Sequence, residues 1–560
     1  MLIYDLIVFF VFVGLLLLTT PLLGNYIARI FSADLLPGES LIYRLLGVDY
    51  KKEMSWVVYA IHLLFFNIFG IFVLFLILVL QGYLPLNPQG FKGFSWDLAL
   101  NTAISFVTNT NWQAYAGENT ISYFSQMLGL TVQNFLSAST GMVVAIALIR
   151  GISRENSYIG NFWVDITRAT IYILLPIAFF SALFLVSQGV IQNFESYIKV
   201  KLLDPILNGG EQTIPMGPVA SQEAIKLLGT NGGGFFGANS AHPFENPTPL
   251  SNFFEAFLIL LIPTALTYTF GKLTGRQKLG WTIYGVMMAL FLSALIFEYV
   301  YMIKNHPEFT KMGVLGPYVE GQETRFGVAG SALFSVVTGS AEAGAVNSML
   351  DSYLPLAGMI PLILVALGVT FGGVGAGLYA MLAYMIIAAF IAGLMVGRVP
   401  EFLQKKLDPS DMWASVIAVL TSTFLILSFT SLSLPTNSGV SSILNPGPHG
   451  ITEVIYAYTS TANNNGSAFA GLNANTLFYN LTTAFVMFVG RFVPIFAVLF
   501  LSGSFAKKKK LPLNPNNLKE DSLIFGLWLI FVIVLVNVLG LFPALSMGPV
   551  LEHLLLYAGG

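Results

Sequence analysis

The 560-residue chain is 55% hydrophobic and only 10% charged, whereas a soluble domain carries about 25% charged residues. This much apolar surface cannot be buried inside one water-soluble globule, so most of it has to face lipid. Cysteine is absent, which excludes a disulfide framework, a thiolate metal site and a cysteine nucleophile. The net charge of −2 gives no reason to expect a nucleic-acid partner.

A helix that crosses the hydrocarbon core of a bilayer needs about 20 mostly apolar residues. In chain order, the sequence contains ten such runs, near residues 3–23, 56–82, 121–149, 169–190, 252–271, 281–303, 355–396, 413–432, 474–503 and 522–545. The expected fold class is therefore an all-α polytopic membrane protein with about ten transmembrane helices.

Positive charge alternates between the connections. Those after the odd-numbered runs hold 18 of the 26 Lys and Arg residues, and those after the even-numbered runs hold 7. The basic set is cytoplasmic by the positive-inside rule. Both termini are then expected outside, which agrees with an even number of spans.

The connections after the second, fourth, sixth and eighth runs each contain a short, weakly amphipathic stretch that ends in small and amide residues. With Asn109, Thr230, Glu342 and Asn464 taken as equivalent, the spacings are 121, 112 and 122 residues. Such a period indicates an internal repeat, and four repeats in one chain give pseudo-fourfold geometry. The alternative is four ordinary capped turns, because Thr, Asn and Gly favour turns. The shared position in every repeat argues against it.

These polar segments have the residue types that an ion filter needs. A short helix that enters from outside points its negative end toward the membrane centre. A turn rich in Gly, Thr and Asn then directs successive carbonyls at one axis, where they replace the hydration shell of a monovalent cation. The candidate filter residues are Thr108, Asn109, Thr110, Thr230, Asn231, Gly232, Gly233, Ser340, Ala341, Glu342, Gly344, Asn463, Asn464, Asn465 and Gly466, with Gln113 expected to brace the filter from outside.

The stretches 108–113, 229–248, 344–347 and 463–471 resemble the potassium-binding subunit (KdpA) family of the bacterial Kdp complex, a P-type ATPase. The resemblance covers essentially the whole chain. It implies the selecting subunit of an ATP-driven, high-affinity potassium importer in the bacterial cytoplasmic membrane. K+ is then the transported ion, and it passes sideways through an intramembrane tunnel to an ATP-hydrolysing, KdpB-like partner. Small KdpC-like and KdpF-like membrane subunits and membrane lipids are the other implied partners.

The family is similar in fold to the Trk, Ktr and HKT transporters, which have four membrane–pore–membrane repeats. Members of the KdpA family have one extra helix at each end. A self-sufficient Trk- or Ktr-type potassium channel or ion-coupled carrier is the alternative function. The expected layout is an N-terminal helix and loop at 1–55, pore repeats at 56–150, 151–272, 273–397 and 398–505, and a C-terminal helix at 506–560.

The seventh apolar run is about 42 residues long, roughly twice what a bilayer needs, so it has to break. We expect the break at residues 372–377, where Gly372, Gly373, Gly375 and Gly377 are candidates for a gate below the filter. Close helix packing through small residues is the other interpretation. The family resemblance favours the gate.

Four charged residues inside or near the spans need an explanation. Arg491 either repels an ion from direct exit or forms a structural bridge to a carboxylate on the cytoplasmic side. Glu342 departs from the small polar residue common in the family, so we expect its side chain to point away from the axis and only its carbonyl to contribute. Glu255 and Glu298 are near outer span ends, where exposure to water is the simpler expectation.

The sequence contains no phosphate-binding glycine loop, no Asp-Lys-Thr-Gly phosphorylation motif and no nucleotide domain. If ATP drives transport, another chain hydrolyses it. We therefore expect a non-catalytic subunit that binds no nucleotide and is not an enzyme by itself.

Overall fold

The computed structural model describes residues 2–203, 210–512 and 519–558 of the chain. Within these residues, 10 helical segments are long and apolar enough to cross a membrane, which confirms the predicted fold class. Their main helices are α1 (Leu2–Ser32), α3 (Trp56–Leu80), α6 (Val132–Ser153), α8 (Leu175–Ser187), α10 (Pro249–Thr274), α11 (Gln277–Met302), α15 (Ala376–Met395), α16 (Pro409–Ser433), α19 (Leu477–Lys507) and α20 (Leu523–Leu545).

Shorter elements extend or connect the spans. The π-helical turns η2 (Ser125–Thr131), η3 (Arg168–Leu174) and η7 (Ser546–Val550) continue directly into α6, α8 and the last helix, α21 (Leu551–Ala558). The remaining short helices are η1 (Gln81–Tyr83), α2 (Glu39–Leu46), α5 (Gly117–Thr120), α7 (Phe162–Thr167), η5 (Asn239–Ala241), α12 (Pro307–Lys311), η6 (Leu350–Ser352) and α17 (Asn437–Val440).

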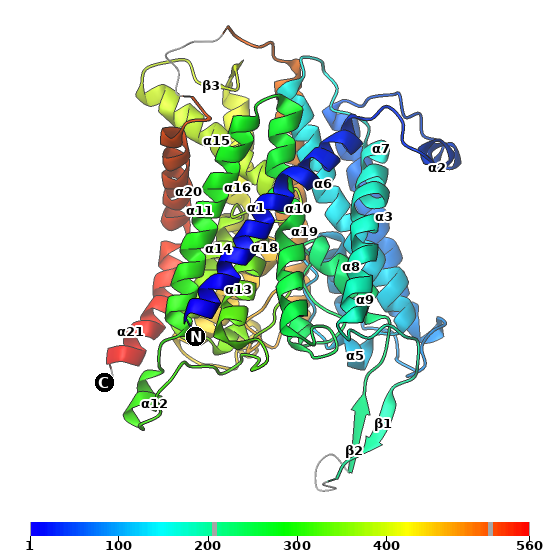
Figure 1. Cartoon of the computed structure of the whole chain (residues 1–560), viewed down its shortest axis with the longest axis vertical. Helices are drawn as coiled ribbons and strands as arrows, with labels where there is room; N and C mark the ends of the chain where they lie inside the picture. The colour runs from blue at the N-terminus through cyan, green and yellow to red at the C-terminus, as the bar shows by residue number, and fades with distance from the viewer. Residues whose placement is uncertain (1, 204–209, 513–518, 559–560) are drawn as a thin grey trace.

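The bundle has two different ends. Both ends of the chain lie at one of them, together with an antiparallel pair of strands, β1 (Ile198–Lys201) and β2 (Glu211–Ile214) (Figure 1). The opposite end carries α2 and a small antiparallel pair, β3 (Glu401–Phe402) and β4 (Lys405–Lys406). We call the first the terminal end and the second the basic end, because the Lys- and Arg-rich connections lie there.

Helix α10 shows how the sequence sets the ends of a span. The Thr248 hydroxyl caps it by accepting from the Ser251 N–H at 3.0 Å, and Pro249 occupies the first position, where a missing N–H costs nothing. Gly275 ends the helix with a φ of 71°, a left-handed conformation that glycine adopts readily. Between these signals the helix is continuous, although Pro263 inside it has no N–H to donate.

The spans divide into an inner and an outer set. In the most apolar part of each span, 83% of the residues of Ser125–Ser153 and 78% of those of α10 are buried, against 17% in α1 and 22% in α3. An apolar helix buried on all sides is packed among other helices, whereas an apolar face left open in the protein faces lipid. Helix α6 is therefore central, and it packs on α10, α15 and α19.

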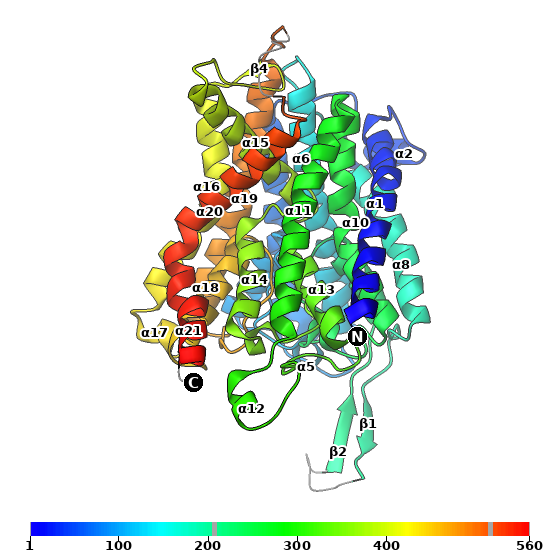
Figure 2. The same cartoon turned by 60° about the vertical axis from the view of Figure 1, so that its left-hand side comes forward.

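Four short helices lie between consecutive spans: α4 (Trp96–Val107), α9 (Val219–Leu228), α13 (Gly327–Ser340) and α18 (Pro448–Ala462). The chain thus runs four times through span, short helix and span, with α1 before and α20 after. The seventh apolar run breaks, as expected, into α14 (Pro355–Leu367) and α15, joined by residues 368–375. Figure 2 shows α14 in the half of the bundle near the termini and α15 in the other half.

The expectation that Glu255 and Glu298 are exposed to water is wrong. Both side chains are fully buried, because the short helices α9 and α13 pack against this part of α10 and α11. Glu298 accepts a hydrogen bond from the Ser335 hydroxyl at 3.0 Å. Hydropathy places a residue near a span end, but it does not reveal that a neighbouring short helix covers that end.

Candidate functional site

The four short helices all end in the same way. The residue after each helix cap has a left-handed backbone, which is uncommon for residues other than glycine. These residues are the four aligned by the sequence spacing: Asn109 (φ 70°), Thr230 (50°), Glu342 (50°) and Asn464 (55°). The caps before them are Thr108, Gly229, Ala341 and Asn463. One conformation at four equivalent positions indicates one repeated structure and not four independent turns.

A repeated hydrogen bond follows the left-handed residue. In each unit the next N–H donates to a carbonyl five residues earlier, at the end of the short helix, over 2.8–3.0 Å. The donor and acceptor residues are Thr110 and Ser105, Asn231 and Lys226, Ala343 and Thr338, and Asn465 and Ser460. Beyond this bond the backbone leaves the helix, so consecutive carbonyls are no longer committed to helical hydrogen bonds.

The four polar segments meet at one point. Gly232 packs against the carbonyl oxygens of Thr110 and Asn465, and an added Cβ would lie only 2.6 Å from the Asn465 oxygen. Gly344 and Gly466 pack against Gly232 in turn, where their added Cβ atoms would lie 2.9 Å and 3.1 Å from the Gly232 Cα. Backbone atoms from all four units therefore crowd one axis, and no side chain fits between them. We call this point the convergence.

Buried amide side chains tie neighbouring segments together. Asn231 Nδ2 donates to Asn109 Oδ1 at 2.7 Å, and Asn109 Nδ2 donates to the Thr230 carbonyl at 2.9 Å. At the other junction, Asn464 Nδ2 donates to Thr110 Oγ1 at 3.0 Å. The first segment is thus bonded to both the second and the fourth.

Gln113 lies outside the convergence and holds the second segment. Its Oε1 accepts from the Gly234 N–H at 2.9 Å, and its Nε2 donates to the Gly234 carbonyl at 3.2 Å. Gly233, which has a φ of 65°, packs directly on the Gln113 amide. The Gln113 side chain is therefore bonded to both backbone groups of Gly234.

Helix α6 contributes two residues that the sequence reading missed. The Ser137 hydroxyl donates to Asn109 Oδ1 at 2.8 Å, and Asn134 Oδ1 accepts from Asn111 Nδ2 at 2.6 Å. Both are fully buried. The available signal was that Asn134 and Ser137 are three apart and share one helix face, but Gln133, Ser139 and Thr140 in the same run obscure it.

The loop 368–375 engages the third segment. Glu342 Oε2 accepts from the Gly373 N–H at 3.3 Å, and the Ser340 carbonyl accepts from the Gly372 N–H at 2.8 Å. The Glu342 carboxylate is therefore held by the loop and not by the other three segments.

The same loop lies next to the convergence on its basic side. The Val374 N–H donates to Thr230 Oγ1 at 3.0 Å, and Gly375 packs against the Gly141 carbonyl of α6. Gly141 is four residues beyond Ser137 on the same helix, which places the loop about 6 Å closer to the basic end. The loop thus lies on the basic side of the convergence, against α6.

The predicted glycines allow this tight path. Gly372 (φ 61°) and Gly375 (φ 85°) are left-handed, and Gly377, at the start of α15, packs on the Phe371 carbonyl. Any Cβ at Gly377 would collide with that oxygen. The glycine-rich stretch therefore forms the break between α14 and α15, and it also packs closely on α6 through Gly375.

Arg491 lies beside the loop. Its Nη2 donates to the Ser137 carbonyl at 3.1 Å and lies 3.1 Å from where a Cβ on Gly141 would be. Among the residues that the structure describes, Arg491 has no salt bridge. The expected bridge to a carboxylate on the basic side is therefore not formed.

A small cavity adjoins the loop on the same side. It has a volume of about 60 Å³ and is lined by Glu342, Tyr379, Ser422, Asn463, Asn464 and Arg491, among others. That is room for several water molecules. Its walls come from α15, α16 and α19 together with the third and fourth segments.

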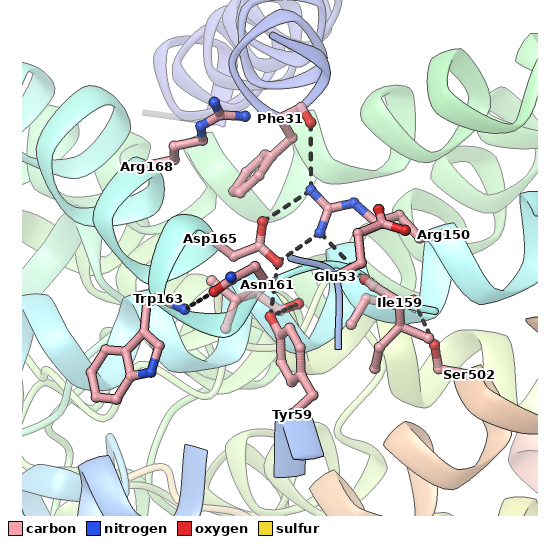
Figure 3. A network of polar contacts seen from close by, with 12 residues as sticks. Phe31, Glu53, Tyr59, Arg150, Ile159, Asn161, Trp163, Asp165, Arg168 and Ser502 are labelled. Atoms are coloured by element: carbon pink, nitrogen blue, oxygen red, sulfur yellow. Dashed lines mark hydrogen bonds and ion pairs between the residues drawn. The ribbon is translucent and has the colours of Figure 1, made fainter. Parts of the chain in front are cut away.

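An ionic network at the basic end joins the central helix α6 to helices of the outer set. Figure 3 shows Arg150 of α6 facing Asp165 of α7, with Nη1–Oδ2 and Nη2–Oδ1 distances of 2.6 and 2.9 Å. The Tyr59 hydroxyl of α3 donates to the same carboxylate at 3.0 Å. Arg150 also donates to the Phe31 carbonyl at the end of α1. Four helices are joined through one buried ion pair.

These features define a multi-pass membrane protein of the four-repeat pore class. Residues 10–554 match the family described as the potassium-transporting ATPase A subunit, and the chain belongs to this family. It is 54% identical to a Hydrogenobaculum sp. protein, over 99% of both chains, and 52% identical to one from Geobacter sulfurreducens, over 97% of both. Both relatives are named potassium-transporting ATPase potassium-binding subunit.

The fold is similar to a solved structure as well. The crystal structure of the potassium transporter TrkH from Vibrio parahaemolyticus superposes with a TM-score of 0.51 at 16% identity, covering 89% of this chain and 98% of that one. This likeness shows a shared fold. The resemblance drawn from the sequence motifs is thereby confirmed at the level of family and architecture.

Proposed function

We propose that this chain is the potassium-selecting, non-catalytic subunit of an ATP-driven potassium importer. The observation that carries the proposal is the convergence of four equivalent backbone segments on one axis, with Gly232, Gly344 and Gly466 packed against carbonyls. Backbone carbonyls arranged around an axis replace the hydration shell of a cation. The family membership supports potassium as that cation.

The charge around the convergence fits a monovalent ion. Asn109, Thr230 and Asn464 are neutral, and the carboxylate of Glu342 is engaged by the loop 368–375. Magnesium and calcium sites are built with carboxylate ligands, which the axis lacks in the part of the chain that the structure describes. We infer that the filter uses carbonyl oxygens and that Glu342 contributes through its backbone.

The ion is then proposed to leave sideways. In this proposal the loop 368–375 crosses the direct route, and the positive charge of Arg491 next to it disfavours a cation there. The cavity lined by Glu342, Ser422 and Arg491 offers a place on the basic side of the filter between α15, α16 and α19. We propose that it begins the path to a P-type ATPase partner, with small accessory membrane subunits and lipids completing the complex.

The proposed orientation follows the charge of the connections. The basic end faces the cytoplasm, and the terminal end, with both ends of the chain, faces outward. The four short helices then enter from outside with their negative ends at the filter. In the proposed layout, residues 56–150, 151–272, 273–397 and 398–505 are the pore repeats.

The test is reconstitution of the chain with and without its ATPase partner. Stable co-purification with a P-type ATPase chain is expected, together with potassium-stimulated ATP hydrolysis that needs both chains. In liposomes, this chain alone is expected to pass no potassium. Sustained potassium flux from the chain alone, without ATP, would overturn the proposal in favour of a Trk-type channel or carrier.

A further inference from the structure

A second cluster of polar side chains lies at the terminal end, away from the convergence. Asp351 lies in η6 after the third segment, and His449 and Glu453 are in the first turns of α18. Residues four apart share one helix face, so α18 presents both side chains together. One ligand-type atom from each of the three residues lies within 4.8 Å of the other two.

The His449 ring is held from both sides. Its Nδ1 is 2.8 Å from Glu552 Oε1, on α21, and its Nε2 is 3.0 Å from Asp351 Oδ1. A neutral imidazole donates from only one nitrogen. With the Nδ1–H directed at Glu552, the Nε2 lone pair of a neutral ring would face the Asp351 carboxylate, so this geometry requires either a proton or a metal cation on Nε2. A carboxylate behind the distal nitrogen is also the usual partner of a metal-binding histidine.

The two carboxylates are close to each other as well. A Cβ added to Gly471 would lie 2.4 Å from Glu453 Oε1 and 2.8 Å from Asp351 Oδ2. Glu453 is fully buried and fixed by the Asn445 side-chain amide at 2.8 Å. Two adjacent carboxylates repel one another unless a positive charge lies nearby. The Glu453 carboxylate is thus held in a fixed orientation by Asn445 without a bound ion.

We propose that His449 Nε2 and the carboxylates of Asp351 and Glu453 bind a divalent transition-metal ion of the zinc class, with Glu552 as the positioning residue. An imidazole ligand favours zinc over magnesium or calcium, which prefer oxygen ligands alone. Three protein ligands leave one tetrahedral position for water. The bound ion would join η6, α18 and α21. The site is separate from the potassium filter and does not rest on the proposed function.

The test is a zinc titration of the full-length chain in detergent, with the free metal set by a chelating competitor dye. One Zn²⁺ per chain is expected, with no competition from a large excess of Mg²⁺. X-ray absorption at the zinc edge is expected to show one imidazole nitrogen and oxygen ligands at about 2.0–2.2 Å. Absence of tight zinc binding, or a shell of oxygen alone, would overturn the proposal without any variant.

Variants then assign the ligands. His449→Gln is expected to abolish stoichiometric binding, and Glu552→Gln to weaken it by about 10- to 100-fold. His306→Gln, at a histidine of the outer connection after α11, is the matched control and should leave binding unchanged. Binding that survives in His449→Gln, or falls equally in His306→Gln, would show that the zinc is held elsewhere.

Discussion

Asn231 and Asn109, from different repeats and 122 positions apart, form a direct side-chain hydrogen bond of 2.7 Å beside the convergence. Because Asn109 also donates to the Thr230 carbonyl, this pair fixes the spacing between the first two segments. An amide can donate and accept at once, whereas a carboxylate only accepts.

Asn231→Asp is therefore expected to reduce discrimination between potassium and sodium, because an oxygen would face the Asn109 oxygen. The measurement is ion-stimulated ATP hydrolysis by the assembled complex, titrated with K+ and Na+. Asn101→Asp is the matched control, since Asn101 is a buried amide that donates to Asn480 and Thr483 away from the convergence. Selectivity that changes equally in both variants would contradict the role given to Asn231.

Gly232→Ala is expected to lower the apparent potassium affinity. Its methyl group would collide with the Thr110 carbonyl and crowd that of Asn465. Overpacking of this kind costs about 1–3 kcal/mol, which corresponds to a loss of roughly 5- to 150-fold if it falls on the bound state. Gly285→Ala in α11, where an added Cβ meets no atom within 4 Å, serves as control. Unchanged potassium affinity in Gly232→Ala would show that this segment does not contact the ion.

Thr230→Val is expected to loosen the loop 368–375 while keeping the Thr230 backbone in place. The change removes the hydroxyl that accepts from the Val374 N–H. The readout is ATP-independent leakage of potassium from liposomes that contain the chain. The control is Thr338→Val, an isosteric change in the short helix α13. Among the described residues the Thr338 hydroxyl has no hydrogen-bond partner, so liposomes with this variant should leak no potassium. If liposomes that contain the Thr230→Val protein leak no potassium, the loop is not the barrier.

Asp165→Asn is expected to destabilise the protein strongly. Asp165 is 1% exposed, and removal of one partner of a buried ion pair costs about 3–5 kcal/mol, because the Arg150 charge is left uncompensated. The control is Glu53→Gln, which breaks the Arg154 pair at a carboxylate 37% exposed; such exposed pairs contribute about 0–1 kcal/mol. The thermal unfolding midpoints of both variants are measured in the same detergent. Equal shifts would contradict the structural role given to the Arg150–Asp165 pair.

Acid is expected to destabilise the connection after the second segment through His242. Burial, and then the nearby Arg325 charge, lower the pKa of His242 from 6.5 to about 4, while its ring stacks on Phe236 at 3.9 Å. The folded protein thus binds fewer protons than the unfolded chain between these values. The stability is fully present above pH 6.5 and is lost as the pH falls toward 4.

His242→Asn keeps an acceptor for the Phe244 N–H but cannot be protonated, so it should flatten this part of the pH profile. Thermal midpoints measured between pH 4 and 7 on both proteins compare the slopes. A profile as steep in His242→Asn as in the unchanged protein would assign the acid sensitivity to other groups.

The sequence was most informative where one signal repeats along the chain. Ten apolar runs, and the break at the glycines near Gly372, follow from hydropathy and length alone. The equivalence of Asn109, Thr230, Glu342 and Asn464 followed from spacing, and the structure gives all four the same left-handed backbone. Each of these inferences depends on local composition or periodicity, which a single sequence contains.

Contacts between distant segments could not be predicted in this way. Nothing local indicates that Ser137 meets Asn109, or that Arg491 donates to a carbonyl of α6. The burial of Glu255 likewise depends on how α9 packs on α10. Such pairings are set by the tertiary arrangement of the repeats, which one sequence does not encode in any local pattern.

The packing of Thr110 against Gly466 has a consequence for biosynthesis. The first and fourth segments are more than 350 residues apart, and the ribosome makes them in that order. During synthesis the first three segments are inserted without the backbone that completes their axis. The convergence therefore cannot be complete until the fourth segment is inserted, and a chain truncated before Asn464 would hold the other three polar segments without it.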